Sequence, residues 1–234
     1  MGIKLSTVEE RLKHIKESIQ LACGRSDRNP EEVTIIAVTK SVGTKRAEEV
    51  LAAGIPDLGE NRKEGLDEKQ PAIGDAARWH FIGNLQSRRV KDIVNRVDMI
   101  HSLDRGSLAR EIQKRADHPV DCFVQVNVSG EDSKAGVIPE ETEPFVRSLA
   151  DHDKIRVVGL MTMAPNTNDE EVIRRTFRGL RELRDRISAL DLPHAPCTEL
   201  SMGMSNDFGI AVEEGATHVR IGTAIVGYES GERP

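Results

Sequence analysis

The stretch Val33-Thr-Ile-Ile-Ala-Val-Thr-Lys40 decides the fold, because an apolar and β-branched run ends there in a lysine. Such a run is typical of a buried strand. It leads through Ser41-Val-Gly-Thr44 into a helical pattern. In a barrel of alternating strands and helices, functional groups lie at this end of each strand, so we expect the Lys40 amine to point into a site. From this stretch alone, a surface lysine that caps a strand is an equally good interpretation.

Further strand patterns follow the first one, and helical patterns separate them. The predicted strands are Val33–Thr39, Asp57–Glu60, Trp79–Gly83, Asp98–Ser102, Val120–Val128, Ile155–Met161, Thr198–Ser201 and His218–Ile221. The predicted helices are Thr7–Cys23, Thr44–Ala53, Arg62–Gln70, Arg88–Asn95, Leu108–Ala116, Glu140–Ala150, Asp169–Leu190 and Phe208–Glu214. Strands separated by helices pair in parallel, which predicts an α/β fold, a (β/α)8 TIM barrel with an extra N-terminal helix. An open doubly wound sheet is the alternative, and residues 1–234 are expected to form a single domain.

The composition excludes several classes of protein. The 234 residues are 38% hydrophobic and carry a net charge of −6, which argues against a nucleic-acid or anionic-membrane surface. The 3 cysteines are far apart and form no C-x-x-C pair, so neither a disulfide framework nor a zinc site is expected. No apolar run is long enough for a signal peptide or a membrane span, which predicts a cytoplasmic protein.

Two loops near the C-terminus predict a phosphate site. Ser201-Met-Gly-Met-Ser205 follows the seventh predicted strand, and Arg220-Ile-Gly-Thr223 ends the eighth. The loops after strands 7 and 8 of such barrels commonly bind phosphate, since backbone N–H groups at a helix start favour an anion. A Gly-Ser turn alone is more often only a turn. Together with Lys40, the two loops suit a phosphorylated aldehyde, because a partly desolvated amine can form a Schiff base.

A series of short motifs runs in a fixed order through residues 33–227. They are Ala37-Val-Thr-Lys40, Leu58-Gly-Glu-Asn61, Trp79-His-Phe-Ile-Gly83 with Leu85-Gln86, His101-Ser102, Gln125-Val-Asn-Val128, Ser133-Lys134-x-Gly136, Gly159-Leu-Met-Thr-Met163, Leu200-Ser-Met-Gly-Met-Ser205 and Val219-Arg-Ile-Gly-Thr223. In this order, they resemble the motifs of the YggS/PROSC-type pyridoxal phosphate homeostasis proteins. The resemblance covers nearly the whole chain, and its specificity comes from the joint pattern.

The resemblance implies a fold-type III barrel, like the N-terminal domain of alanine racemase, with pyridoxal 5′-phosphate (PLP) bound to Lys40 as a Schiff base. It implies no catalytic residues, but the following cofactor-binding set: Lys40, Asn61, His80, Ser201, Met202, Gly203, Arg220, Gly222 and Thr223. No metal site is expected, because the 7 histidines form no H-E-x-x-H motif and have no cysteine partner. Ser201 and the backbone around Gly222 and Thr223 would hold the phosphate, and Met202 and Gly203 would line that side.

The same resemblance places Arg220, Asn61 and His80 around the pyridine ring. Arg220 would face the ring edge, where like-charge repulsion would keep the ring nitrogen unprotonated. Asn61 and His80 end the second and third strand patterns and could line the ring. For His80, a place in the core is about as good an interpretation.

The chain departs from the family pattern at four positions beside the expected site. Arg62 follows Gly-Glu-Asn where the family often has an aromatic residue, and Asn84, Arg88 and Arg89 replace the more usual His, Asn and Lys. These changes leave the cofactor assignment intact. They affect which ligands could enter the barrel mouth from the side of the second and third predicted strands.

Lys134 matches a family lysine and could offer the aldehyde a second amine. The better interpretation is a solvated loop lysine, because Glu131 and Asp132 are near enough in sequence to pair with it.

The sequence favours a PLP carrier over an enzyme. Racemisation needs two bases, and the single tyrosine, Tyr228, lies beyond the last strand with no second domain to supply another. We therefore expect a monomeric protein that binds PLP, buffers it, delivers it to PLP-dependent apoenzymes and so affects amino- and keto-acid metabolism. A PLP-dependent racemase or lyase that uses Lys40 is the main alternative, and a Schiff-base aldolase acting on a sugar phosphate is another.

Overall fold

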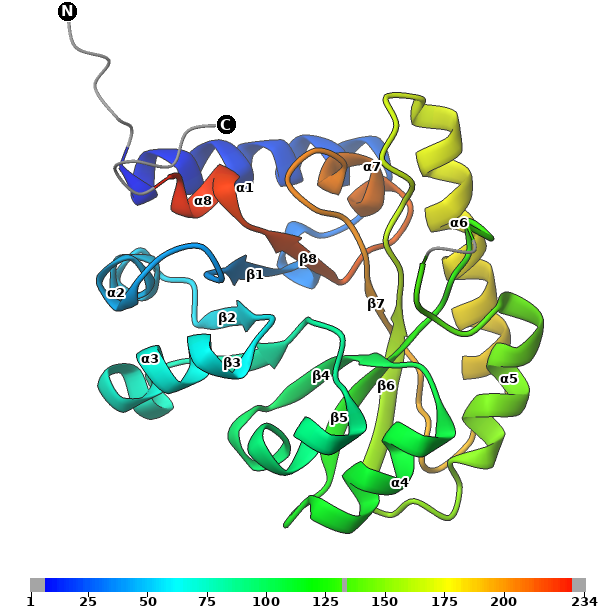
Figure 1. The fold of residues 1–234 in the computed structure, drawn as a ribbon. Helices are drawn as coiled ribbons and strands as arrows, with labels where there is room; N and C mark the ends of the chain where they lie inside the picture. The colour runs from blue at the N-terminus through cyan, green and yellow to red at the C-terminus, as the bar shows by residue number, and fades with distance from the viewer. Residues whose placement is uncertain (1–6, 132–133, 229–234) are drawn as a thin grey trace, which may run out of the picture.

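The computed structural model describes residues 7–131 and 134–228, whose strands close into one parallel barrel. Each strand pairs with the next in the chain, and β1 pairs with β8 to complete the ring. The strands, which can be followed in Figure 1, are β1 (Thr34–Val38), β2 (Asp57–Glu60), β3 (Arg78–Phe81), β4 (Met99–Leu103), β5 (Val120–Gln125), β6 (Ile155–Met161), β7 (Glu199–Ser201) and β8 (His218–Ile221). The predicted (β/α)8 barrel is confirmed.

Helices surround the barrel. They are α1 (Val8–Arg25), α2 (Thr44–Ala52), α3 (Lys63–Ile73), α4 (Gly106–Arg115), α5 (Pro139–Ser148), α6 (Glu170–Ser188), α7 (Phe208–Glu213) and α8 (Thr223–Val226), with short 3-10 segments η1 (Pro30–Glu32), η2 (Gly74–Ala76), η3 (Ser87–Asp92) and η4 (Val94–Arg96). Within residues 7–131 and 134–228, no helix has the length and apolar character needed to cross a membrane.

The extra N-terminal helix α1 begins at a capping box. The Thr7 hydroxyl accepts a hydrogen bond from the Glu10 N–H, and the Glu10 carboxylate accepts one from the Thr7 N–H. Its apolar face is buried, and Arg11 Nε donates a 2.6 Å hydrogen bond to the carbonyl of Ile225 in α8. Figure 1 shows α1 lying beside α7 and α8, so it covers the side on which β8 meets β1.

Two predicted helices differ from the observed ones. Helix α3 was expected to stop before Pro71 but continues to Ile73, whose buried side chain anchors the last turn. Proline there removes only one backbone donor near the helix end. The predicted helix Arg88–Asn95 is instead the pair η3 and η4, in which Ile93 N–H bonds to the Val90 carbonyl at 3.0 Å. This i→i+3 pattern is the tighter 3-10 geometry.

The interior of the barrel combines apolar and polar side chains. Phe123, Val158 and Met161 form a small buried cluster. Beside it, several buried polar groups come from different strands: His80, His101, Ser201, His218 and Arg220. Buried polar groups need hydrogen-bond partners. We therefore expect these side chains to form hydrogen bonds with one another inside the barrel.

Candidate functional site

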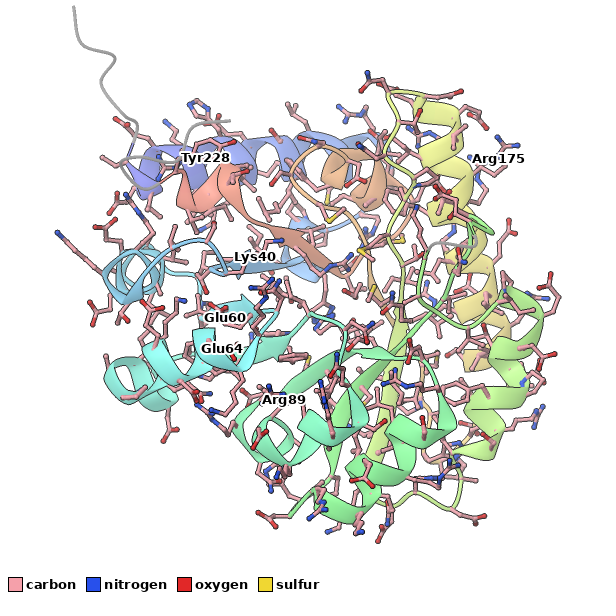
Figure 2. All side chains as sticks on the ribbon, viewed as in Figure 1. Lys40, Glu60, Glu64, Arg89, Arg175 and Tyr228 are labelled. Carbon is pink, nitrogen blue, oxygen red and sulfur yellow. The ribbon has the colours of Figure 1, made fainter. Side chains whose placement is uncertain are left out.

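Lys40 lies two residues beyond the end of β1, at the mouth formed by the carboxyl ends of the strands. Its side chain is exposed, whereas the preceding Thr39 is fully buried. Figure 2 shows Lys40 just beyond β1, near Glu60 of the neighbouring strand β2. The buried Thr39 therefore holds the backbone just before Lys40 in place, while the Lys40 amine stays accessible from the mouth.

A buried ion pair supports the backbone below Lys40. Glu60 and Lys69 are each 1% exposed, and Lys69 Nζ lies 3.0 Å from Glu60 Oε1. The Thr39 hydroxyl donates to the same oxygen at 2.5 Å. These contacts join β1, β2 and α3. Sequence reasoning missed the pair, although a glutamate inside a buried strand signals the need for a cation.

Arg220 of β8 lies buried below the mouth. Its two terminal nitrogens donate to the Ser201 hydroxyl at 2.6 Å and to the Thr162 carbonyl at 3.0 Å. Burial lowers the pKa of Arg220 to about 10, and the Asp207 carboxylate opposes this shift. A guanidinium has five N–H donors, so after these two contacts Arg220 keeps donors for a ligand at the mouth.

Gly222 and Thr223 follow Arg220 and lie beside β1. A Cβ built on Gly222 would be 3.7 Å from Val38 Cβ, so the end of β8 and the end of β1 are adjacent. Thr223 is exposed and begins α8. The first N–H groups of a helix have no acceptor within the helix. The loop after β8 thus offers a hydroxyl and backbone donors on the strand next to that of Lys40.

The loop after β7 is held close to the helix that follows it. Gly203 has a φ of 93°, and a Cβ there would be 2.5 Å from the Cβ of Ala211, so this position requires glycine. Met202 is fully buried in the main core cluster. The Ser201 side chain is also fully buried, and its hydroxyl contacts Arg220 and His101 Nδ1 at 2.8 Å. Ser201 and Met202 therefore support the mouth from below.

The structure separates Asn61 from His80. Asn61 is partly buried after β2 and lines a cavity of about 310 Å³ at the side of the mouth. His80 is 1% exposed inside the barrel, where Nε2 lies 3.0 Å from Asp57 Oδ1 and Nδ1 lies 3.0 Å from His101 Nε2. Both ring nitrogens are engaged, which matches the core interpretation of this histidine.

The four departures from the family pattern all line the same side cavity. Arg62, Asn84, Arg88 and Arg89 contribute to it together with Asn61. Arg88 Nε donates to Gln86 Oε1 at 2.9 Å, and Figure 2 shows Arg89 on this side of the barrel. These substitutions therefore change the wall of a neighbouring cavity and leave the Lys40 and Arg220 positions untouched.

Lys134 is paired within its own loop. Its amine contacts the Glu131 carboxylate and lies 3.5 Å from the Ser129 hydroxyl. The interpretation of Lys134 as a loop lysine with an acidic partner is supported by Glu131, whereas the expected partner Asp132 lies outside the described residues.

The donor set at the mouth suits a phosphorylated aldehyde. It combines an accessible primary amine, a hydroxyl with backbone donors, and a buried cation below them. Among the residues that the structure describes, no group of three or more His, Cys, Asp and Glu side chains could hold a metal ion.

Comparisons with known proteins agree on the family of this chain. The family "Alanine racemase, N-terminal domain" matches residues 11–230. A pyridoxal phosphate homeostasis protein of Aquifex aeolicus is 42% identical over 225 residues, which cover 93% of this chain and 96% of that protein. The structure of PipY from Synechococcus elongatus with PLP bound is 30% identical with a TM-score of 0.79, and the match covers 94% of this chain and 100% of PipY. Alanine racemase from Corynebacterium glutamicum is 16% identical with a TM-score of 0.71 over 96% of this chain and 63% of the racemase, a likeness of fold alone.

Proposed function

The chain belongs to the family of pyridoxal phosphate homeostasis proteins, and we propose that it binds PLP through Lys40 and passes it on without catalytic turnover. It is a PLP-binding protein of PLP homeostasis. The observation that carries the role of Lys40 is the position of its exposed amine at the end of β1, beside the glycine-containing end of β8.

The described residues fit PLP. When bound, PLP supplies an aldehyde that condenses with an amine and a phosphate that anchors it. Lys40 provides the amine, while Thr223 and the backbone from Gly222 onward provide donors for the phosphate. Gly203 shapes the opposite loop, and Ser201 and Met202 support this side from within the barrel.

Arg220 sets the electrostatics expected around the pyridine ring. Both of its acceptors, the Ser201 hydroxyl and the Thr162 carbonyl, are uncharged, so its positive charge is not cancelled by them. A cation beside the ring nitrogen disfavours a proton there, which weakens the cofactor as an electron sink. A contact of Asn61 with the ring from the β2 side belongs to this proposal, and in the structure this residue lines the side cavity.

The arrangement favours storage and delivery over racemisation. A racemase needs a second base on the opposite face of its substrate, and Tyr228, the only tyrosine, is 51% exposed and lies beside α1 and α8 (Figure 2). His80 is engaged inside the barrel. We accordingly expect a cytoplasmic monomer whose partners are PLP and PLP-dependent apoenzymes, with a racemase or lyase as the alternative.

A transfer experiment tests this function. The protein is loaded with PLP, freed of excess by gel filtration and mixed with an apo-aminotransferase, and a recovery of transaminase activity is expected. Lys40→Ala protein taken through the same steps should restore little activity. In parallel, incubation with L-alanine should yield no D-alanine above the Lys40→Ala control. D-alanine that depends on Lys40 would establish the racemase alternative instead.

A further inference from the structure

A continuous line of hydrogen bonds crosses the barrel interior from its amino end to its mouth. Asp57 at the start of β2 lies 3.0 Å from His80 Nε2, and His80 Nδ1 lies 3.0 Å from His101 Nε2. His101 Nδ1 lies 2.8 Å from the Ser201 hydroxyl, which accepts a 2.6 Å bond from Arg220. We call these five residues the interior network.

The Asp57 end of the interior network fixes the direction of its hydrogen bonds when each histidine carries one proton. Arg220 can only donate, and an ionised Asp57 can only accept. Burial alone would raise the pKa of Asp57, but hydrogen bonds from His80 and Arg78 outweigh it and hold the pKa below its usual value. With one proton on each histidine, His80 donates to Asp57 through Nε2–H, His101 donates to His80 through Nε2–H, and Ser201 donates to His101 Nδ1.

This direction requires both histidines to be neutral. A second proton on His80 or His101 would place two donors opposite each other in one contact. Burial, followed by the effects of the neighbouring His80, Arg220 and His218, lowers the pKa of His101 well below its ordinary value. Phe123 stacks on the His101 ring with centroids 4.4 Å apart, which fixes the plane of the ring.

We propose that Asp57, His80, His101 and Ser201 are positioning residues that orient the Arg220 guanidinium toward the pyridine ring of PLP. The proposal rests on the proposed function, because the ligand of Arg220 is the cofactor. Ser201 acts here through Arg220: its hydroxyl proton is committed to His101, so it can accept a bond from a ligand but not donate one. Donation to the phosphate falls to Thr223 and the neighbouring backbone.

Other charged groups face the interior network from adjoining elements. Arg78 contacts Asp57 at 2.8 Å, His218 of β8 lies 6.4 Å from both histidine rings, and Asp207 acts on Arg220 from the loop before α7. None of these three lies between Asp57 and Arg220 in the hydrogen-bond order. A change at Asp57 can therefore reach Arg220 through the histidines.

The first test reads the histidines directly in the ligand-free protein. Two-dimensional ¹H–¹⁵N spectra of histidine-labelled protein, assigned with single substitutions, report tautomer and charge. His80 and His101 should each carry a single proton, on Nε2. A proton on Nδ1 of either ring, or a ring that carries both protons, would overturn the proposed direction. This result does not depend on PLP binding.

The second test asks whether substitutions at Asp57 and Ser201 change the binding of PLP and the pKa of its ring nitrogen. Asp57→Ala and Ser201→Ala should each weaken PLP binding about tenfold, the scale of a lost hydrogen bond to a charged group, and raise the pKa of the bound ring nitrogen. Asp57→Asn keeps an acceptor for His80 and should recover most of the loss. Thr142→Val, which removes a fully buried hydroxyl on α5, is the matched control and should bind like wild type.

The outcomes separate the two proposals. If wild type binds no PLP, the proposed function fails while the tautomer result still stands. A second outcome is that wild type binds PLP while both alanine variants keep the wild-type affinity and ring-nitrogen pKa. In that case the interior network only satisfies buried polar groups, and the positioning role is wrong. Unfolding curves of each variant identify any loss that comes from stability alone.

Discussion

Arg220 on β8 donates a 2.6 Å hydrogen bond to the Ser201 hydroxyl on β7, inside the barrel and below the mouth. The contact joins a buried cation to a neutral acceptor. A buried charge needs hydrogen bonds even without a counter-ion in contact, and this one directs the guanidinium from below. The properties of any ligand at the mouth should therefore depend on Arg220.

Replacing Arg220 with glutamine should change the pKa of the pyridine nitrogen of PLP and leave the attachment of PLP to Lys40 unchanged. Without the cation, protonation of the ring nitrogen is no longer opposed, so its pKa should rise. A pH titration of the absorption spectrum of the PLP-loaded protein measures this pKa. Arg156→Gln, at an arginine paired with Asp121 on the outside of β6, is the control. An unchanged pKa in Arg220→Gln would place Arg220 away from the ring.

Lys69→Met should destabilise the protein strongly, because it leaves the Glu60 carboxylate buried without a cation. Breaking a buried ion pair in this way costs about 3–5 kcal/mol of the free energy of unfolding, which urea denaturation measures. Lys63→Met breaks an exposed pair with Asp67 in the same helix and should cost less than about 1 kcal/mol. Equal losses in the two variants would show that the Glu60–Lys69 pair is not buried in solution.

Two glycines at the mouth should respond differently to alanine. Gly203→Ala forces a methyl group to 2.5 Å from Ala211 at a positive φ, so it should lower the free energy of unfolding by about 1–3 kcal/mol. Gly222→Ala meets only Val38 at 3.7 Å, so stability should be kept while PLP affinity falls.

Gly24→Ala serves as the control for this pair, since a Cβ there meets nothing within 4 Å and alanine suits the helix. Denaturation and PLP titration of the three variants separate the two effects. Undiminished PLP binding by Gly222→Ala would argue against the backbone of this loop as the phosphate site.

Stability should fall in mild acid because of buried histidines. Burial, with the nearby His80, lowers the pKa of His218 to about 4 in the folded protein. In the unfolded chain a histidine has a pKa of about 6.5. Between these values the unfolded state binds more protons, so the free energy of unfolding rises with pH and is fully restored above about pH 6.5.

The slope from each such histidine approaches about 1.4 kcal/mol per pH unit within this window. His218→Gln should flatten the dependence measured by denaturation between about pH 4 and pH 6.5. His14→Gln, at an exposed position on α1, should not. A wild-type stability that is flat across this range would contradict neutral, buried histidines.

The barrel could be predicted because strand periodicity is local. The predicted bounds of β2, β6 and β8 agree with the structure. Of these three strands only β6 is a mainly apolar run, while β2 and β8 include charged residues. The one-turn helix α8 was not predicted, because four residues are too few to show a helical period. The 3-10 segments η3 and η4 carry helix-like spacing, which sequence alone reads as an α-helix.

The candidate site could be predicted only in part, for a similar reason. Lys40 and the loops after β7 and β8 follow from their positions at strand ends. The interior network joins β2, β3, β4, β7 and β8, and His101 and Ser201 lie 100 positions apart in sequence. Which buried polar residues meet across a barrel depends on strand register, and sequence patterns do not determine it.

The attachment of PLP to Lys40 is the central claim, and a visible absorption spectrum of the purified protein with added PLP tests it most directly. Wild type and Lys134→Ala should show the band of a lysine Schiff base, and Lys40→Ala should lack it. Borohydride reduction and peptide mapping should then find the label on Lys40. A band that persists in Lys40→Ala, or a label on another lysine, would contradict the account.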